Sequence, residues 1–189
     1  MSFIKFAILS TLGELLGLRI STGNYYRTGF GVLPHAVVWG IFGMGINMAF
    51  IIFSTGVPAV AAYLGVADPA GIMAGPVCLS KVLLALAISV CLNSIFAPVF
   101  MTFHKITDTH ILATGGTLQG LFTPIPMGDI MQNMNWHVQW NFVFKKTIPF
   151  FWYPAHTITF LLPGESRVLF AALLGVVLGV ILAIAARKK

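Results

Sequence analysis

Long apolar stretches, separated by shorter segments rich in glycine, proline and polar residues, run along most of the chain. Four of them are interpreted as membrane-spanning helices: 30–54, 77–103, 147–162 and 167–186. A helix needs about 20 mostly apolar residues to cross the hydrocarbon. The last stretch is uninterrupted, whereas the third carries Pro149, Pro154 and His156 and is the weakest. The pattern predicts an all-α, polytopic transmembrane helix bundle with four spans.

The N-terminal segment 1–20 has a mixed pattern. Its polar positions Lys5, Ser10, Glu14 and Arg19 do not gather on one face of a helix. We therefore expect either a helix lying on the membrane surface or an additional, fifth span. In both cases the 189 residues are predicted to form a single transmembrane domain.

Prolines and glycines mark the expected connections. Residues 55–80 contain Pro58, Pro69 and Pro76 and are predicted to be a connection with a short helix around 60–66. Residues 105–146 are predicted to be a long connection at the membrane surface. Pro98 cannot donate a hydrogen bond to the Ser94 carbonyl, and a kink is expected there.

Composition supports a membrane location. Hydrophobic residues make up 58% of the chain and charged residues 8%, whereas soluble domains carry about 25% charged residues. The net charge of +6 comes from residues that flank the apolar stretches, which indicates topology signals and not nucleic-acid binding.

The basic residues also predict an orientation. Only Lys81 and Arg167 fall on one predicted side, and nine fall on the other: Lys5, Arg19, Arg27, Lys105, Lys145, Lys146, Arg187, Lys188 and Lys189. Basic residues favour the cytosolic or matrix side. We expect the C-terminus there, in a bacterial inner membrane or in a mitochondrial inner or peroxisomal membrane.

Polar residues within the apolar stretches are the first functional candidates. Asn47, Asn93 and Ser94 lie near mid-span, and Lys81, His35 and His156 complete a candidate polar pathway. The alternative is that such residues only form hydrogen bonds between helices, worth about 1 kcal/mol each.

The histidines invite a metal or proton-transfer interpretation. There are five, but only His104 has an acidic partner at i+4 helical spacing, Asp108. Without a metal-binding motif and with five acidic residues in total, we expect no metal site, no cofactor and no enzymatic activity. A membrane enzyme using His104 and His110 is a weaker hypothesis that rests on residue types alone.

Small residues indicate close helix packing. Gly175-Val-Val-Leu-Gly179 is a G-x-x-x-G pattern in an apolar stretch, which lets two helix backbones approach closely. The contact is expected either within one protomer or in a homo-oligomer.

One stretch resembles a known family: Phe151-Trp-Tyr-Pro-Ala-His-Thr-Ile-Thr-Phe-Leu-Leu-Pro-Gly-Glu-Ser-Arg-Val-Leu-Phe170. It is similar to the W-P, Q, N-F, V-P, R signature of the Mpv/peroxisomal membrane protein family, through Pro154, Phe160, Pro163 and Arg167. Asn93-Ser-Ile-Phe-Ala-Pro-Val-Phe100 resembles the family's D-Q segment followed by A-P, through Pro98. The family's acidic position is occupied by Leu92-Asn93.

The resemblance implies a channel, or a protein that supports metabolite and redox balance across organelle membranes. We expect a weakly selective channel or a protein of metabolite and ion homeostasis, and the missing acidic residue favours a weakly selective or anion-tolerant path. The alternative is a packing or assembly subunit of a larger membrane complex. The expected partners are the lipid bilayer and a homo-oligomer or larger complex, without nucleic acid.

Overall fold

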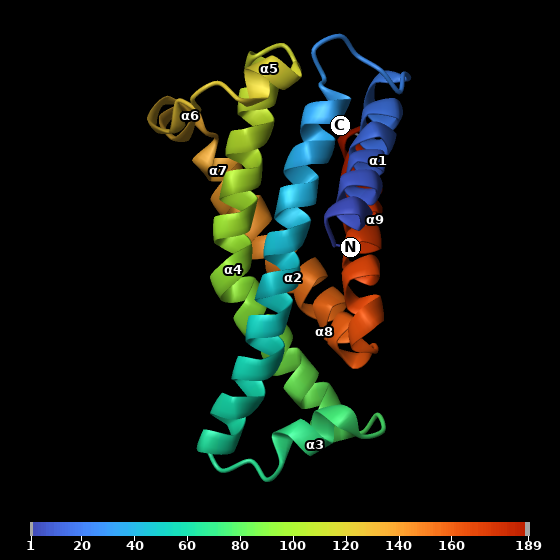
Figure 1. Cartoon of the computed structure of the whole chain (residues 1–189), viewed down its shortest axis with the longest axis vertical. Helices are drawn as coiled ribbons and strands as arrows, with labels where there is room; N and C mark the ends of the chain where they lie inside the picture. Colours follow the sequence, from blue (N-terminus) through green and yellow to red (C-terminus); the bar gives the residue numbers. More distant parts are fainter. Residues whose placement is uncertain (1, 188–189) are drawn as a thin grey trace. The chain divides into compact units, whose positions relative to one another are not determined.

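The computed structural model describes residues 2–187 as helices joined by short connections (Figure 1). In chain order these are α1 (Ser2–Thr22), α2 (Val32–Tyr63), α3 (Pro69–Ala74), α4 (Leu79–Ala113), α5 (Leu118–Leu121), α6 (Met127–Asn133), α7 (Trp136–Val138), the π-helix η1 (Gln139–Trp152), α8 (Tyr153–Leu161) and α9 (Gly164–Arg187). This range contains no strand, so the predicted all-α class is confirmed. Lys188 and Lys189, both used in the orientation argument, lie outside the described residues.

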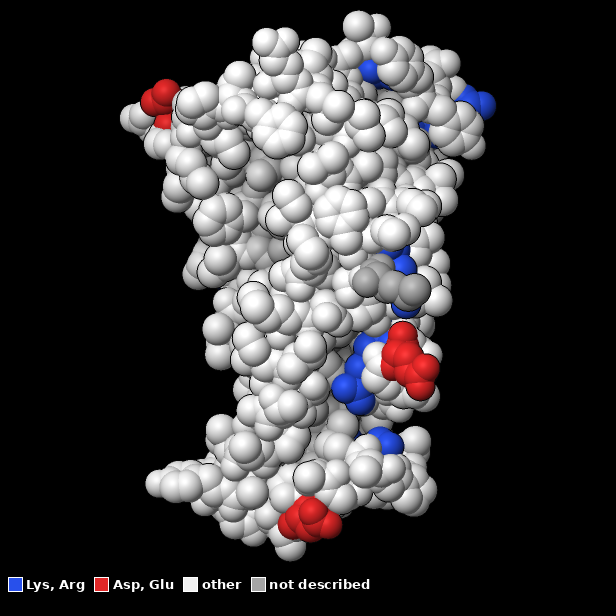
Figure 2. Space-filling model, viewed as in Figure 1, with Lys and Arg blue, Asp and Glu red and all other residues white. Residues whose placement is uncertain are grey.

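Three helices are long and apolar enough to cross a membrane: α2, α4 and the part Gly164–Ile181 of α9. They correspond to the predicted spans 30–54, 77–103 and 167–186. The predicted span 147–162 comprises the end of η1 and all of α8, and it is not among the three. Fewer than half of the residues in the membrane-length part of each of these helices are buried in the isolated chain, and the face drawn in Figure 2 consists largely of uncharged residues.

Two predicted helix ends are wrong. α2 continues through Pro58 to Tyr63, so no separate helix lies around 60–66, and α4 continues through Pro98 to Ala113, so the connection after 105 is shorter and largely helical. Ending an apolar helix would free several backbone groups, whereas one proline removes one hydrogen bond. Hydroxyls near both prolines bond to backbone carbonyls: Thr55 Oγ1 donates to Ile51 O at 2.8 Å and Thr102 Oγ1 to Pro98 O at 2.8 Å.

Residues in contact divide into two compact units. The first contains Met1–Gly45, Phe103–Met134 and Val168–Lys189. The second contains Ile46–Thr102 and Asn135–Arg167. The long helices α2 and α4 each contribute to both units. The two units are described separately below.

Glycines let α1 pack closely in the first unit. A Cβ added to Gly43 of α2 would lie 2.5 Å from Phe6 Cβ of α1, and one added to Gly13 of α1 would lie 3.0 Å from Val176 Cα of α9. Phe6 is buried as a result. Figure 1 shows α1 running beside α9 and the N-terminal part of α2.

A second close approach joins the start of α2 to the end of α4. Gly31 (φ 76°) and Gly116 (φ 66°) both have left-handed backbones, which glycine adopts without a steric penalty. A Cβ added to Gly31 would lie 2.6 Å from Gly116 Cα. This contact places the first turns of α2 beside the last turns of α4.

We expect Gly43→Ala to destabilise the protein, although glycine to alanine in a helix interior normally stabilises by about 1 kcal/mol. The added methyl must displace Phe6, and overpacking of this kind costs about 1–3 kcal/mol. Gly45→Ala on the same helix is the control, because nothing lies within 4 Å of its added Cβ. Thermal unfolding in detergent should show a lower midpoint for the first variant only, and equal midpoints would contradict the α1–α2 packing.

Candidate functional site

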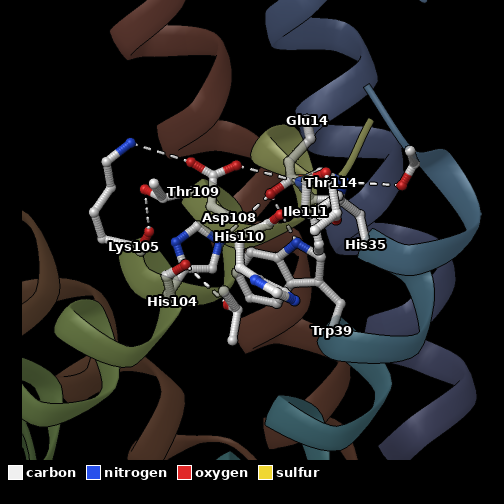
Figure 3. Close-up of polar contacts among 12 residues, drawn as sticks. Glu14, His35, Trp39, His104, Lys105, Asp108, Thr109, His110, Ile111 and Thr114 are labelled. Carbon is white, nitrogen blue, oxygen red and sulfur yellow. Dashed lines mark hydrogen bonds and ion pairs between the residues drawn. The ribbon is translucent and has the colours of Figure 1, made fainter. Parts of the chain in front are cut away.

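Titratable side chains from three helices meet in the first unit (Figure 3). Glu14 comes from α1, His35 from α2, and His104, Lys105 and Asp108 from α4. We call these five residues the charged cluster. Two of the five acidic residues in the chain belong to it. The other three lie at Asp68, Asp129 and Glu165.

Helical spacing and the glycine contact together assemble the cluster. His104 and Asp108 are four residues apart on α4, and His35 and Trp39 are four residues apart on α2, so each pair shares one helix face. The close approach of Gly31 and Gly116 brings these two faces together. Glu14 then reaches both faces from α1.

His35 lies at the centre of the cluster and is almost fully buried. Its Nδ1 lies 2.9 Å from Gly31 O, which can only accept, so Nδ1 carries the hydrogen. Its Nε2 lies 3.2 Å from Asp108 Oδ1 and 3.7 Å from Glu14 Oε2. The Phe30 ring stacks on the imidazole, with centroids 4.8 Å apart. The ring is therefore held in one orientation between two carboxylates.

Glu14 links the three helices. Its Oε1 accepts a hydrogen bond from Trp39 Nε1 at 2.9 Å and lies 3.4 Å from His104 Nε2. Its Oε2 is buried without a hydrogen bond in the described structure and lies 3.7 Å from His35 Nε2. One carboxylate oxygen is thus held in place while the other faces the imidazole.

Lys105 completes the charge balance at the edge of the cluster. Its Nζ donates to Asp108 Oδ2 at 3.2 Å, and half of its side chain is exposed. Each oxygen of Asp108 therefore has its own partner, His35 for one and Lys105 for the other.

The cluster is built for hydrogen bonds and ion pairs. Within residues 2–187, no group of three His, Cys, Asp or Glu side chains is placed to hold a metal ion. Its acids and imidazoles are groups that exchange protons. The chemistry that this arrangement supports is the binding and transfer of a proton or the passage of a small charged species.

A second, neutral cluster lies in the second unit and consists of Ser89, Asn93 and His156. Asn93 Nδ2 donates to Ser89 O at 2.8 Å, and His156 Nδ1 donates to Asn93 Oδ1 at 3.1 Å. Ser89 Oγ donates to Tyr153 O at 2.8 Å. All three residues are buried. These contacts join α4 to α8 in the manner of hydrogen bonds between membrane helices.

The residues of the predicted polar pathway are only partly brought together. Asn93 and His156 contact each other, whereas His35 belongs to the first unit and to the charged cluster. Ser94 is exposed and shares a hydrogen bond of 2.8 Å with the Tyr153 hydroxyl. Asn47 is half-buried on α2. Lys81 Nζ donates to Gly75 O at 2.6 Å, near the start of α4.

Most residues that carry the family resemblance lie where α8 ends and α9 begins or in α8 itself. The Arg167 guanidinium donates to Leu162 O at 3.0 Å and Phe160 O at 3.2 Å, and it lies 5.6 Å from the centroid of the buried Phe160 ring. Pro154 stands in the first turn of α8, Pro163 precedes α9, and Pro98 lies inside α4. The Arg167 contacts hold the end of α8.

The two glycines of the G-x-x-x-G pattern differ. A Cβ on Gly179 would lie 3.5 Å from Gly13 O of α1, whereas nothing lies within 4 Å of one on Gly175. Gly179 thus supports packing of α9 on α1 within the chain.

Sequence reasoning missed Glu14, Asp108 and Trp39 as site residues. The i, i+4 spacing of His104 and Asp108 was a usable signal, and Glu14 is an acid within a largely apolar segment. Neither signal identifies a partner on another helix. The convergence of α1, α2 and α4 depends on tertiary packing.

No family model, curated protein or solved structure matches the chain. The function is therefore inferred from the geometry of the chain's own residues. The charged cluster is the arrangement in the described structure that brings the most ionisable side chains together.

We expect Asp108→Ala to lower the free energy of unfolding by about 2 kcal/mol. Removing one partner of a buried ion pair costs about 3–5 kcal/mol, and partial exposure of Asp108 reduces this. Asp129→Ala, at an exposed position on α6, is the matched control and should have little effect. Reversible unfolding in mixed micelles measures both, and equal losses would show that the His35–Asp108 contact does not stabilise the protein.

Asn93→Ala tests the neutral cluster. The substitution leaves the buried His156 Nδ1–H without its acceptor, which costs about 1–3 kcal/mol. Its exposed neighbour provides the control, and Ser94→Ala should cost less than about 1 kcal/mol. Thermal unfolding in detergent compares the two, and an Asn93→Ala midpoint at or above that of Ser94→Ala would contradict the assigned contacts.

Proposed function

We propose that the protein is an integral membrane permeation protein, a weakly selective channel or a protein of ion and metabolite homeostasis of the Mpv type. Its functional site in this proposal is the charged cluster. The observation that carries the proposal is the convergence of two carboxylates and two imidazoles from α1, α2 and α4, in a chain with so few charged residues.

Energetics support this proposal. His35 is 3% exposed at its side chain, and a buried charged group is costly unless it is paired. Replacing a buried ion pair by apolar residues of similar volume is often neutral or stabilising, so packing alone does not require the cluster. Ionisable residues at such positions typically mark ion or proton pathways.

The proposal includes a topology. Beyond the three membrane-length helices, the continuous helical segment of η1 and α8 is a fourth crossing, and α1 is either a helix at the membrane surface or a fifth crossing. The charge bias supports a C-terminus on the cytosolic or matrix side, in a bacterial inner membrane or in a mitochondrial inner or peroxisomal membrane. The exposed apolar surfaces of the long helices are occupied by lipid or by neighbouring copies.

The proposal differs from the expected selectivity. The missing acidic residue at Leu92-Asn93 suggested an anion-tolerant path, whereas Glu14 and Asp108 supply carboxylates elsewhere, on α1 and α4. A site with these acids favours cations over anions.

Reconstitution into liposomes tests the function. We expect the purified protein to conduct K⁺ better than Cl⁻, and the double variant Glu14→Gln and Asp108→Asn to lower the K⁺ rate on the order of tenfold, because it removes the two carboxylates that attract a cation to the site. Glu165→Gln, an exposed acid at the start of α9, is the control and should conduct like the natural sequence.

Folded protein that conducts no ion or small solute would overturn the proposal. Purification of the protein in a fixed ratio with a different membrane protein, together with absent flux, would favour the assembly-subunit alternative. Native mass measurement of the detergent-solubilised protein distinguishes these cases.

A further inference from the structure

The contacts of His35 require a proton between its Nε2 and Asp108. Its Nδ1–H donates to Gly31 O, and its Nε2 faces Asp108 Oδ1 at 3.2 Å. An ionised carboxylate accepts and does not donate, so without a further proton two lone pairs would oppose each other at this distance. One proton must lie between His35 Nε2 and Asp108, on one atom or the other.

Charge balance supports the same count. With this proton, the set of Glu14, Asp108, Lys105 and His35 has a net charge of zero, taking one negative charge for each acid and one positive charge each for Lys105 and protonated His35. Without it the set carries a net charge of −1. Apolar surroundings disfavour an unbalanced charge.

The contacts continue beyond His35. From Asp108 Oδ1 to His35 Nε2 is 3.2 Å, from His35 Nε2 to Glu14 Oε2 is 3.7 Å, and from Glu14 Oε1 to His104 Nε2 is 3.4 Å. Acids and imidazoles alternate along this row, so every neighbour can give or take a proton. Shortening the two longer contacts by a few tenths of an ångström makes them hydrogen bonds.

Burial closes off His35 and leaves its three partners in the row partly exposed. The His35 side chain is 3% exposed, whereas those of Glu14, Asp108 and His104 are 20%, 24% and 28% exposed. A proton on His35 therefore reaches the surface of the unit through the neighbouring members of the row. A proton can move between groups that are already in contact without separating them.

The other surroundings of His35 do not interrupt this row. Trp39 on α2 supplies a single N–H donor to Glu14, Lys105 holds the outer oxygen of Asp108, and α9 from Val168 to Ile184 contains no titratable side chain. Within residues 2–187, the ion pairs of the row join its own members and Lys105.

We propose that Asp108, His35, Glu14 and His104 form a proton relay, and that H⁺ is an ion that the charged cluster passes. The proton leaves the Asp108 carboxyl for His35 Nε2, breaking an O–H bond and forming an N–H bond. It then moves to Glu14 Oε2, and rotation of the Glu14 carboxyl presents it to His104 Nε2. No charge other than the proton is transferred, and each donor returns to its starting state when the next proton arrives.

This inference rests on the proposed permeation function and is tested in the same liposomes. A K⁺ gradient with valinomycin drives H⁺, and an enclosed pH-sensitive dye reports its rate. His35→Gln and Glu14→Gln should each lower the rate at least tenfold, because a positioned acid or base contributes about 10²–10⁴-fold to proton transfer. His137→Gln, at an exposed position of α7, and Glu165→Gln should stay within about twofold of the natural sequence.

A conservative variant separates chemistry from structure. Glu14→Asp keeps the carboxyl and should retain more H⁺ flux than Glu14→Gln, although glutamine preserves the side-chain length and an oxygen for the Trp39 hydrogen bond. Equal rates for Glu14→Asp and Glu14→Gln would overturn the relay. Circular dichroism and a single peak in size-exclusion chromatography show that each variant is folded.

Flux measurements of K⁺ and H⁺ separate failure of the relay from failure of the proposed function. If the protein conducts K⁺ and the H⁺ flux of His35→Gln and Glu14→Gln equals that of the natural sequence, the relay is overturned and the proposed function stands. If the protein conducts neither ion, the relay and the proposed function are both overturned.

Discussion

Hydrocarbon offers no hydrogen-bond partner to a polar group, and most features of this structure follow from that constraint. Helices of membrane length must keep their backbone groups paired, so α2 and α4 continue through Pro58 and Pro98 instead of ending there. Hydroxyls of Thr55 and Thr102 bond to carbonyls nearby. Length and apolar composition therefore outweigh the usual helix-ending effect of proline.

The same constraint explains why polar side chains occur in clusters. In the second unit, Ser89, Asn93 and His156 satisfy one another without a formal charge. In the first unit, acids, imidazoles and one lysine balance their charges through direct contacts. A neutral network of this kind joins helices, whereas a charged one also provides groups that exchange protons, and this difference is the basis of the functional argument.

Close helix packing makes the charged cluster geometrically possible. Gly43 and Gly13 let α1 contact α2 and α9, and the left-handed Gly31 and Gly116 bring the ends of α2 and α4 together. A Cβ added to Gly43 or Gly31 would lie 2.5 Å or 2.6 Å from an atom of the neighbouring segment, so the segments would have to shift. Glycine in this chain therefore positions acidic and basic groups as well as helices.

The sequence by itself determined the all-helical class, the three long apolar helices and the sparse charges, because hydrophobic length is a local property. It also singled out His35, Asn93 and His156, since polar residues in apolar stretches are conspicuous. Only the tertiary structure decided that Glu14 meets His35 and Asp108, and that Asn93 meets His156. Those contacts join residues far apart in the chain, and their formation depends on which helix faces pack together, which no local pattern specifies.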